Sequence, residues 1–463
     1  MGAAPLLEAF LIRTISLDGG AMPLVIEGRH PLVGEVDILG AKNAALPIIA
    51  ATLLTSDECL LENVPYIEDI RNTVKALRHL GVAARFEGRN NVRIKATRIS
   101  RASLPIDLVQ KLRASFLMVG PLLSRFGQAE SPPPGGCAIG TRSISLHLKG
   151  FQAMGGAVTQ KGESYVISAR RLRGERIILD YPSHTGTENL LMAACLAEGT
   201  TYIENASIEP EVVDLANFLC SMGARIHGAG TGTIQVEGTC RLHGAAYRIM
   251  PDRMEAGTFA LGALITGGEV SMDGAVSRWL GALTIKMREA GAEVTASKQV
   301  YKVSAPRSLT GVDIQTYPYP GFPTDMQPLF GTLMTQAEGD SAIYETMYDG
   351  RLQYVSELKG MGAHIDVSSG RRATVHGPTP LRGATVCALD IRSGAAMVLA
   401  GLAAEGITRI SHVICIDRGY QDIDLKLQRL GAVVSRVEEA EYPCPTCNAE
   451  EPVEWAALPF GFE

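Results

Sequence analysis

Apolar stretches with the length of helices recur along the chain, and β-branched runs lie between them. Four of these stretches, rich in Ala, Leu and Met, occupy residues 189–197, 256–265, 326–334 and 395–403. A glycine follows each within a few residues, where helices commonly end, and runs such as residues 200–203 and 407–410 have the composition of strands. Helices that are apolar on every side are normally buried. The pattern therefore predicts helices in the core with sheets around them.

A second motif closes a more polar helix six times. Successive glycines of this motif are 68 to 74 residues apart, and each stands between a hydrophobic and a small residue. An internal period of this length indicates structural repeats. The sequence thus predicts six copies of one βαβαββ-type unit and a fold of the α/β (α+β) class. The six glycines are Gly81, Gly155, Gly223, Gly291, Gly362 and Gly431.

Length, charge and composition narrow the class of protein. A chain of 463 residues exceeds what one core usually supports, so we expect two domains of three units each. The net charge of −6 argues against a nucleic-acid partner, and no apolar run has the length of a membrane span. The nine cysteines do not form the pattern of a disulfide framework, which favours the reducing cytoplasm.

A loop rich in proline and glycine carries the sharpest local signal. Residues 131–142 contain three prolines in a row and then Cys137, which cannot lie in a helix or a central strand. Arg142 follows five residues later, and a nearby cation favours the reactive thiolate. The alternative is an inert cysteine that happens to fall in a linker, because most single cysteines are inert.

Basic residues stand at the edges of several predicted elements. Lys42 and Asn43 open the first apolar helix, where the helix dipole already favours an anion. Ion pairing at the surface could account for one or two such residues, but less easily for the whole set. The further members are Arg113, Arg142, Arg392 and Arg418.

Other polar residues leave a structural and a functional interpretation open. Thr324 and Asp325 precede an apolar helix and could simply cap it, as could Asp252 and Glu255. His147 and His184 are possible anion contacts or ordinary structural histidines. Two cysteines near the end, Cys444 and Cys447, form at most half of a zinc site, which needs four ligands. We therefore expect no metal.

Four motifs together resemble one family. Residues 42–47, 135–140, 322–327 and 417–420 are, in this order and spacing, closely similar to the enolpyruvyl transferases that act on UDP-N-acetylglucosamine. The similarity covers about residues 22–437 and implies an inside-out αβ prism in which the chain crosses twice between two domains. The implied domain I comprises residues 22–41 plus 251–437 and domain II residues 42–250; residues 1–21 would be a tail, with Met1 or Met22 as the start, and residues 438–463 an extension.

The resemblance implies a reaction and a cationic pocket for it. Members of the family transfer enolpyruvyl from phosphoenolpyruvate to the 3-hydroxyl of UDP-N-acetylglucosamine and release phosphate, without metal or cofactor, in the synthesis of peptidoglycan precursors. Phosphoenolpyruvate carries a phosphate and a carboxylate, which lysine and arginine bind well. By resemblance Lys42, Arg142 and Arg418 contact the phosphate. Arg392 and Lys426 complete the pocket.

The same resemblance assigns the catalytic groups and the acceptor side. Asp325 corresponds to the base toward the attacking hydroxyl, and Cys137 to the loop cysteine near the vinyl carbon; Lys42 and Arg418 complete the catalytic set. The residues implied to bind the nucleotide sugar or to line the closed cleft are Asn43, Arg113, Ser143, Ser145, His147, Ser183, His184, Thr324, Met347 and Arg351.

Two departures from the family pattern fall on the acceptor side. Ser145 stands where the family has an aspartate, and residues 183–187 differ from the usual diphosphate loop. They leave open a homologous transferase that acts on another uridine nucleotide. A shikimate-pathway relative fits less well, because that branch lacks the cysteine loop. A silent nucleotide-sugar-binding protein would have no need of a base or a loop thiol.

Overall fold

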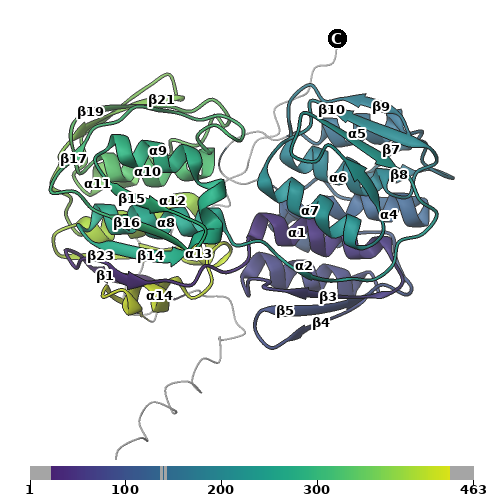
Figure 1. The fold of residues 1–463 in the computed structure, drawn as a ribbon, viewed down its shortest axis with the longest axis horizontal. Coiled ribbons are helices and arrows are strands. Elements are labelled where there is room, and N and C mark those ends of the chain that lie inside the picture. The colour runs from purple at the N-terminus through teal and green to yellow at the C-terminus, as the bar shows by residue number, and fades with distance from the viewer. Residues whose placement is uncertain (1–21, 136–138, 140–142, 438–463) are drawn as a thin grey trace, which may run out of the picture.

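The chain forms two bodies that lie side by side (Figure 1). The structure is a computed structural model that describes residues 22–135, 139 and 143–437. One hydrophobic core, with members within residues 24–36 and 254–434, lies in body I, which comprises the elements from Leu24 to Glu35 and from Arg253 to Arg436. A second core lies in body II, residues 41–250. The chain therefore passes between the bodies twice, once near residue 40 and once near residue 251.

Body II contains three sheets. Each contains antiparallel pairs, and two of them add a parallel edge strand, β13 beside β3 and β9 beside β10. In spatial order the strands are β13 (Ala246–Arg248), β3 (Glu58–Glu62), β5 (Asn91–Lys95) and β4 (Ala83–Glu87); β6 (Gln128–Ser131), β8 (Ser164–Ser168) and β7 (Ala157–Lys161); and β11 (Arg225–His227), β12 (Thr233–Glu237), β10 (Thr200–Glu204) and β9 (Arg176–Ile178).

Body I contains three further sheets, so the six predicted units are confirmed. Two of these sheets each include one strand from the start of the chain. Strand β1 pairs with β23 and β24 in one sheet, and β2 pairs with β14 in the other. The orders are β22 (Thr385–Cys387), β23 (Ile407–Ser411), β1 (Leu24–Glu27) and β24 (Val433–Arg436); β15 (Glu293–Ala296), β16 (Val300–Ser304), β14 (Glu269–Asp273) and β2 (Val33–Glu35); and β17 (Leu309–Thr310), β19 (Ala337–Tyr344), β21 (Arg372–Gly377) and β20 (Ile365–Ser368), with β18 (Ile314–Gln315) beside β19.

The apolar helices lie in the middle of each body, as the pattern predicts. Helices α8, α10 and α12 contact one another in body I, and α6 contacts α1 and α4 in body II. Every residue of α8 is buried. The helices are α1 (Lys42–Ala51), α2 (Glu68–His79), α3 (Ile106–Lys111), α4 (Val119–Phe126), α5 (Ser145–Ala153), α6 (His184–Ala194), α7 (Pro210–Ser221), α8 (Arg253–Ile265), α9 (Gly281–Glu289), α10 (Gln327–Met334), α11 (Tyr354–Gly360), α12 (Ile391–Ala403), α13 (Ile414–Asp417) and α14 (Ile423–Arg429), with the 3₁₀ helices η1 (Thr52–Leu54), η2 (Arg113–Met118), η3 (Gly274–Trp279) and η4 (Thr324–Met326).

The two crossings pair with each other and place two helix starts at the boundary. The Ala41 amide donates to the Met250 carbonyl at 2.7 Å, and the Asp252 amide donates to the Leu39 carbonyl at 2.8 Å. A Cβ at Gly40 would lie 1.7 Å from the Asn63 carbonyl oxygen, so this close approach requires glycine. Helix α1 begins directly after the first crossing and α8 after the second.

Among the described residues, no helix is both long enough and apolar enough to cross a bilayer.

Candidate active site at the boundary of the two bodies

Asp325 lies in a group of charges at the edge of body I. Its carboxylate forms an ion pair with Arg351 and accepts a hydrogen bond from Arg392 Nε at 2.9 Å. Both arginines are buried, whereas 27% of the Asp325 side chain is exposed. The residue before η4 is Pro323, and no side chain caps this short helix. The carboxylate therefore binds guanidinium groups and does not act as the helix cap that the sequence left open.

Arg392 is fixed on several sides. It lies in the first turn of α12, where Asp390 caps the helix through the amides of residues 392 and 393. Its Nη1 donates to the Tyr420 hydroxyl at 3.0 Å, and that hydroxyl pairs with Thr258 Oγ1 at 2.9 Å. Burial alone would lower the pKa of Arg392, but Tyr420, Asp325 and Asp252 raise it above its usual value. The cation is therefore permanent and held in one orientation.

Lys42 and Arg418 converge on one carboxylate across the boundary. Asp69 of α2 lies 2.6 Å from Lys42 Nζ and accepts a hydrogen bond from Arg418 Nε at 2.8 Å. Burial raises the pKa of Asp69, but the two cations outweigh burial and hold it below its usual value. Arg418 follows α13 in body I, while Lys42 and Asp69 belong to body II. The two predicted phosphate contacts thus meet although they come from different bodies.

Asp252 connects these two groups. Its carboxylate caps α8 through the amides of Met254 and Glu255 and also accepts the Lys42 amide at 3.2 Å. The structural interpretation of Asp252 as a cap is therefore correct. Because the same carboxylate acts on Arg392, the charge of Asp252 is shared between the starts of α1 and α8 and the cation of α12.

Lys426 is buried and, among the described residues, pairs with neither Asp69 nor Asp325 but with a third carboxylate. Its Nζ donates to Glu255 Oε1 at 2.6 Å and to the Asp37 carbonyl at 2.8 Å. Burial raises the pKa of Glu255, and the Lys426 charge acts against this shift. In this arrangement Lys426 links the segment before the first crossing to α8 and so stabilises their contact.

The predicted acceptor residues of body II form their own group. Arg113 donates to the Ser143 carbonyl at 3.3 Å, and the Ser145 amide donates to Ser143 Oγ at 3.0 Å. His147 is buried, with Nδ1 at 3.1 Å from the Asn189 amide nitrogen. Burial, and next the charge of Arg113, lowers the pKa of His147 to about 3. His147 is therefore neutral and contacts no anion by charge.

Ser183 and His184 open helix α6. Ser183 Oγ accepts the Gly186 amide at 3.1 Å and so caps the helix. His184 Nε2 lies 3.0 Å from Glu188 Oε1. Burial lowers the pKa of His184, but Glu188 and then the neighbouring Glu211 outweigh it and raise the pKa to about 9. His184 is thus a cation at neutral pH, unlike His147.

Further contacts between the bodies involve predicted site residues. The Tyr181 hydroxyl donates to Met347 Sδ at 3.0 Å, and the Gly350 amide donates to the Ile139 carbonyl at 3.1 Å. Ile139 therefore contacts body I immediately before Arg351. Asn43 is half-buried in the first turn of α1. Cys137, Arg142, Cys444 and Cys447 lie outside the described residues.

Sequence reasoning missed the carboxylates that hold these cations. Asp69 is one of two acidic residues at the start of an ordinary polar helix, and nothing in its spacing points to Lys42. Glu345 is fully buried and accepts hydrogen bonds from Thr316 and Thr324, both at 3.0 Å. Glu345 follows directly after β19, a strand of mixed polar and apolar residues, and its charge acts on Arg351. No pattern in the sequence marks it.

The arrangement is suited to binding a small, multiply charged anion. Lys42, Arg418 and Arg392 are cations, and each forms an ion pair with a carboxylate. A phosphate or carboxylate group binds such cations through charge-assisted hydrogen bonds. Asp325 adds a partly exposed carboxylate that can accept a proton.

Known proteins share this architecture and sequence. The family model described as EPSP synthase (3-phosphoshikimate 1-carboxyvinyltransferase) matches residues 26–427. A UDP-N-acetylglucosamine 1-carboxyvinyltransferase 1 from Caldanaerobacter subterraneus is 48% identical over 413 residues, 89% of this chain and 99% of the relative. The solved structure of the enolpyruvyl transferase NikO from Streptomyces tendae superposes with a TM-score of 0.82 at 24% identity. The match covers 90% of this chain and 99% of NikO.

The chain therefore belongs to the EPSP synthase family of 1-carboxyvinyltransferases, also called enolpyruvyl transferases. A second relative, from Magnetococcus marinus, is also a UDP-N-acetylglucosamine 1-carboxyvinyltransferase. It is 48% identical over 415 residues, which cover 89% of this chain and 99% of the relative. The fold and the family that the four motifs predict are confirmed.

Proposed function

We propose that this protein transfers the enolpyruvyl group of phosphoenolpyruvate to the 3-hydroxyl of UDP-N-acetylglucosamine and releases phosphate. The observation that carries the proposal is the 48% identity, over nearly the full length, to two relatives with this name. We further propose that the product feeds peptidoglycan precursor synthesis in the cytoplasm, and through it cell shape and division.

The residues of the boundary can supply each part of this reaction. The net change replaces the bond between the vinyl carbon and the phosphate oxygen by a bond to the sugar oxygen, and the hydroxyl proton leaves with the phosphate. Asp325 is the proposed proton acceptor. Lys42 and Arg418 are proposed to hold the phosphate, because they already converge on the carboxylate of Asp69. Cys137 is proposed to lie near the vinyl carbon.

Binding of the donor then requires an exchange of partners. Phosphoenolpyruvate brings negative charge to cations that are balanced by Asp69 and Asp325, so the ligand competes with these carboxylates. The bonds that are lost and those that are gained are both charge-assisted, and the larger negative charge of phosphoenolpyruvate favours the exchange. Once the ligand takes the place of Asp325 beside Arg392, one oxygen of Asp325 becomes available to the sugar hydroxyl.

Phosphate release from phosphoenolpyruvate tests the proposal. We expect release with UDP-N-acetylglucosamine and none with its 3-deoxy analogue, which keeps the nucleotide and the sugar but lacks the reacting hydroxyl. Uridine monophosphate and shikimate 3-phosphate complete the panel. Release with either of these and none with UDP-N-acetylglucosamine would show that the protein is a different member of the family.

A further inference from the structure

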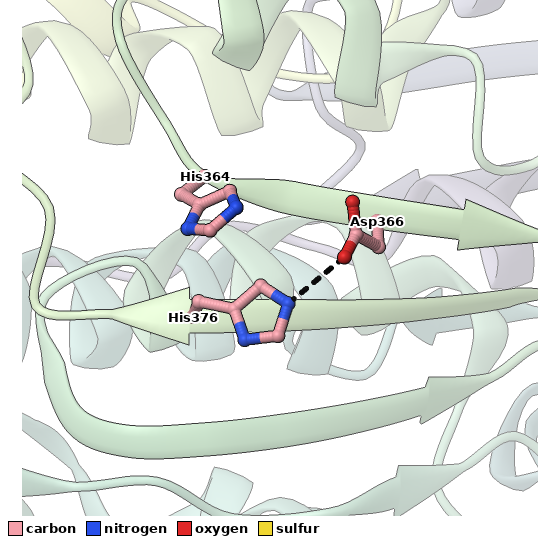
Figure 2. Close-up of side chains that lie close together, drawn as sticks. All are labelled: His364, Asp366 and His376. Atoms are coloured by element: carbon pink, nitrogen blue, oxygen red, sulfur yellow. Dashed lines mark hydrogen bonds and ion pairs between the residues drawn. The ribbon is translucent and has the colours of Figure 1, made fainter.

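A cluster of two histidines and two aspartates lies on the outer face of one sheet of body I, and the proposed reaction does not use it. Figure 2 shows Asp366 and His376 on neighbouring strands and His364 just before one of them, with the three side chains close together. Asp366 lies on β20 and His376 on β21. The fourth member, Asp340 of β19, lies directly opposite His376 in the strand register.

The register explains why these side chains share a face. Side chains alternate between the two faces of a strand, and the alternate residues Ile365, Ala373 and Val375 are buried in the core. The His376 amide donates to the His364 carbonyl at 2.9 Å, so these two residues also lie opposite each other. The cluster therefore spans three adjacent strands and is displayed toward solvent.

The contacts within the cluster converge on His376. Its Nε2 lies 3.2 Å from Asp366 Oδ2, and its Nδ1 lies 2.8 Å from Asp340 Oδ1. The rings of His364 and His376 are 4.5 Å apart between centroids. One ligand atom from each of His364, Asp366 and His376 can be chosen so that all lie within 4.8 Å of one another.

We propose that His364, Asp366 and His376 bind a divalent transition-metal ion of the zinc, cobalt or nickel type. Tetrahedral bonds of about 2.0–2.1 Å to nitrogen and oxygen place neighbouring ligand atoms about 3.3 Å apart, which agrees with the 3.2 Å between His376 and Asp366. Two imidazoles favour these ions over magnesium or calcium, which prefer oxygen ligands.

Asp340 has the position of a supporting residue. Histidines that bind a metal nearly always donate their other ring N–H to a carboxylate or carbonyl, which fixes the ring and its tautomer. Asp340 accepts from Nδ1 of His376 in this way, while Nε2 points toward Asp366. The presence of this fourth residue distinguishes the cluster from a chance meeting of exposed side chains.

His364 completes the site as its third ligand. The three ligand atoms lie within 4.8 Å of one another, and two bonds of 2.1 Å join atoms up to about 4.2 Å apart. His364 is exposed and precedes β20, so its ring can turn without disturbing the core. Because β20 is the edge strand of its sheet, the ion would fasten this edge to β21. An ion that binds only the folded chain stabilises it by mass action.

Titration of the full-length protein with Co²⁺ tests the site. We expect one ion per chain, with the visible absorption of nitrogen and oxygen ligands and without the charge-transfer band of thiolates, which separates this site from Cys444 and Cys447. The double variant H364A/H376A should lose this absorption and the associated rise in melting temperature. The matched control is H227A, which removes another exposed histidine, on β11 of body II.

A second variant tests the supporting role of Asp340. Asp340→Asn should weaken Co²⁺ binding by about ten- to a hundredfold, as loss of such a partner usually does, while the absorption at saturation keeps its form. Enolpyruvyl transfer by both variants should match the wild type, which also shows that they fold. Unchanged Co²⁺ absorption and affinity in H364A/H376A, or binding lost equally in H227A, would overturn the proposal.

Discussion

The charged residues at the boundary pair with partners that lie far away in the sequence. Asp69 is 349 positions from Arg418 and still accepts its hydrogen bond. Lys42 and Arg418 could be proposed from the sequence because basic residues at the edges of elements are typical of anion-binding sites. Their partner could not, because a carboxylate on a polar helix is usually solvated, whereas Asp69 is buried.

Asp325 offers the sharpest test at this scale. We expect Asp325→Asn to lower kcat by about two to four orders of magnitude, because an amide cannot take the proton of the hydroxyl. The amide oxygen can still accept from one of the two arginines, so nucleotide-sugar binding and cooperative unfolding should persist. Steady-state kinetics, calorimetric titration and thermal unfolding measure the three quantities.

Asp390→Asn is the matched control for Asp325→Asn. Asp390 lies 3.6 Å from Arg351, and its side chain caps α12. Asparagine caps a helix about as well as aspartate, so this variant removes a similar negative charge but no proposed base. Its turnover should remain close to the wild type. If the two variants had the same turnover, Asp325 would be only a partner of the arginines.

At the scale of elements, the apolar pattern predicts which helices are buried but starts three of the four too late. The apolar runs begin at residues 189, 256 and 395, whereas α6, α8 and α12 begin at His184, Arg253 and Ile391. The first turns that the pattern omits are polar, and they hold His184, Arg253 and Arg392. Hydrophobic periodicity misses them because these side chains form ion pairs and do not pack in an apolar core.

The close packing of helices α4 and α6 could not be predicted from the sequence either. Helix α4 approaches α6 at Gly120, whose amide donates to Asn189 Oδ1 at 2.8 Å. A Cβ at Gly120 would lie 2.4 Å from that oxygen and 2.5 Å from the Asn189 carbonyl oxygen. Asn189 in turn contacts His147, so the packing of these two helices also positions part of the acceptor group.

We therefore expect Gly120→Ala to separate α4 from α6 and to lower the free energy of unfolding by about 1–3 kcal/mol, the usual cost of overpacking. Urea denaturation measures the loss. The control is Gly281→Ala in the first turn of α9, where a Cβ would meet nothing within 4 Å; alanine there should be neutral or slightly stabilising. An equal change in both variants would show that backbone propensity, and not the helix contact, decides the effect.

At the scale of the whole molecule, the bodies are joined by ion pairs of very different burial. Arg253 of body I donates to Glu211 of body II at 2.9 and 3.1 Å and forms a second ion pair with Glu209. The Arg253 side chain is only 5% exposed. Arg89 and Asp422 also pair across the boundary, at 2.8 Å, but 58% of the Arg89 side chain is exposed. The first pair is shielded from water and salt, while the second is not.

This difference predicts which contact holds the bodies together. Burial raises the pKa of Glu211, but Arg253 and then His184 outweigh it and keep the carboxylate ionised. Arg253→Met removes the main counter-charge and leaves two carboxylates facing each other. Because an unpaired buried charge costs about 3–5 kcal/mol, we expect the bodies to move apart so that water can reach Glu209 and Glu211.

Small-angle scattering of the R253M protein without ligand should show a larger radius of gyration, and urea denaturation a lower stability. Arg89→Ala is the control, with an expected cost of about 0–1 kcal/mol for an exposed pair and an unchanged scattering profile. Identical profiles for wild type, R253M and R89A would mean that the buried ion pair does not hold the boundary closed.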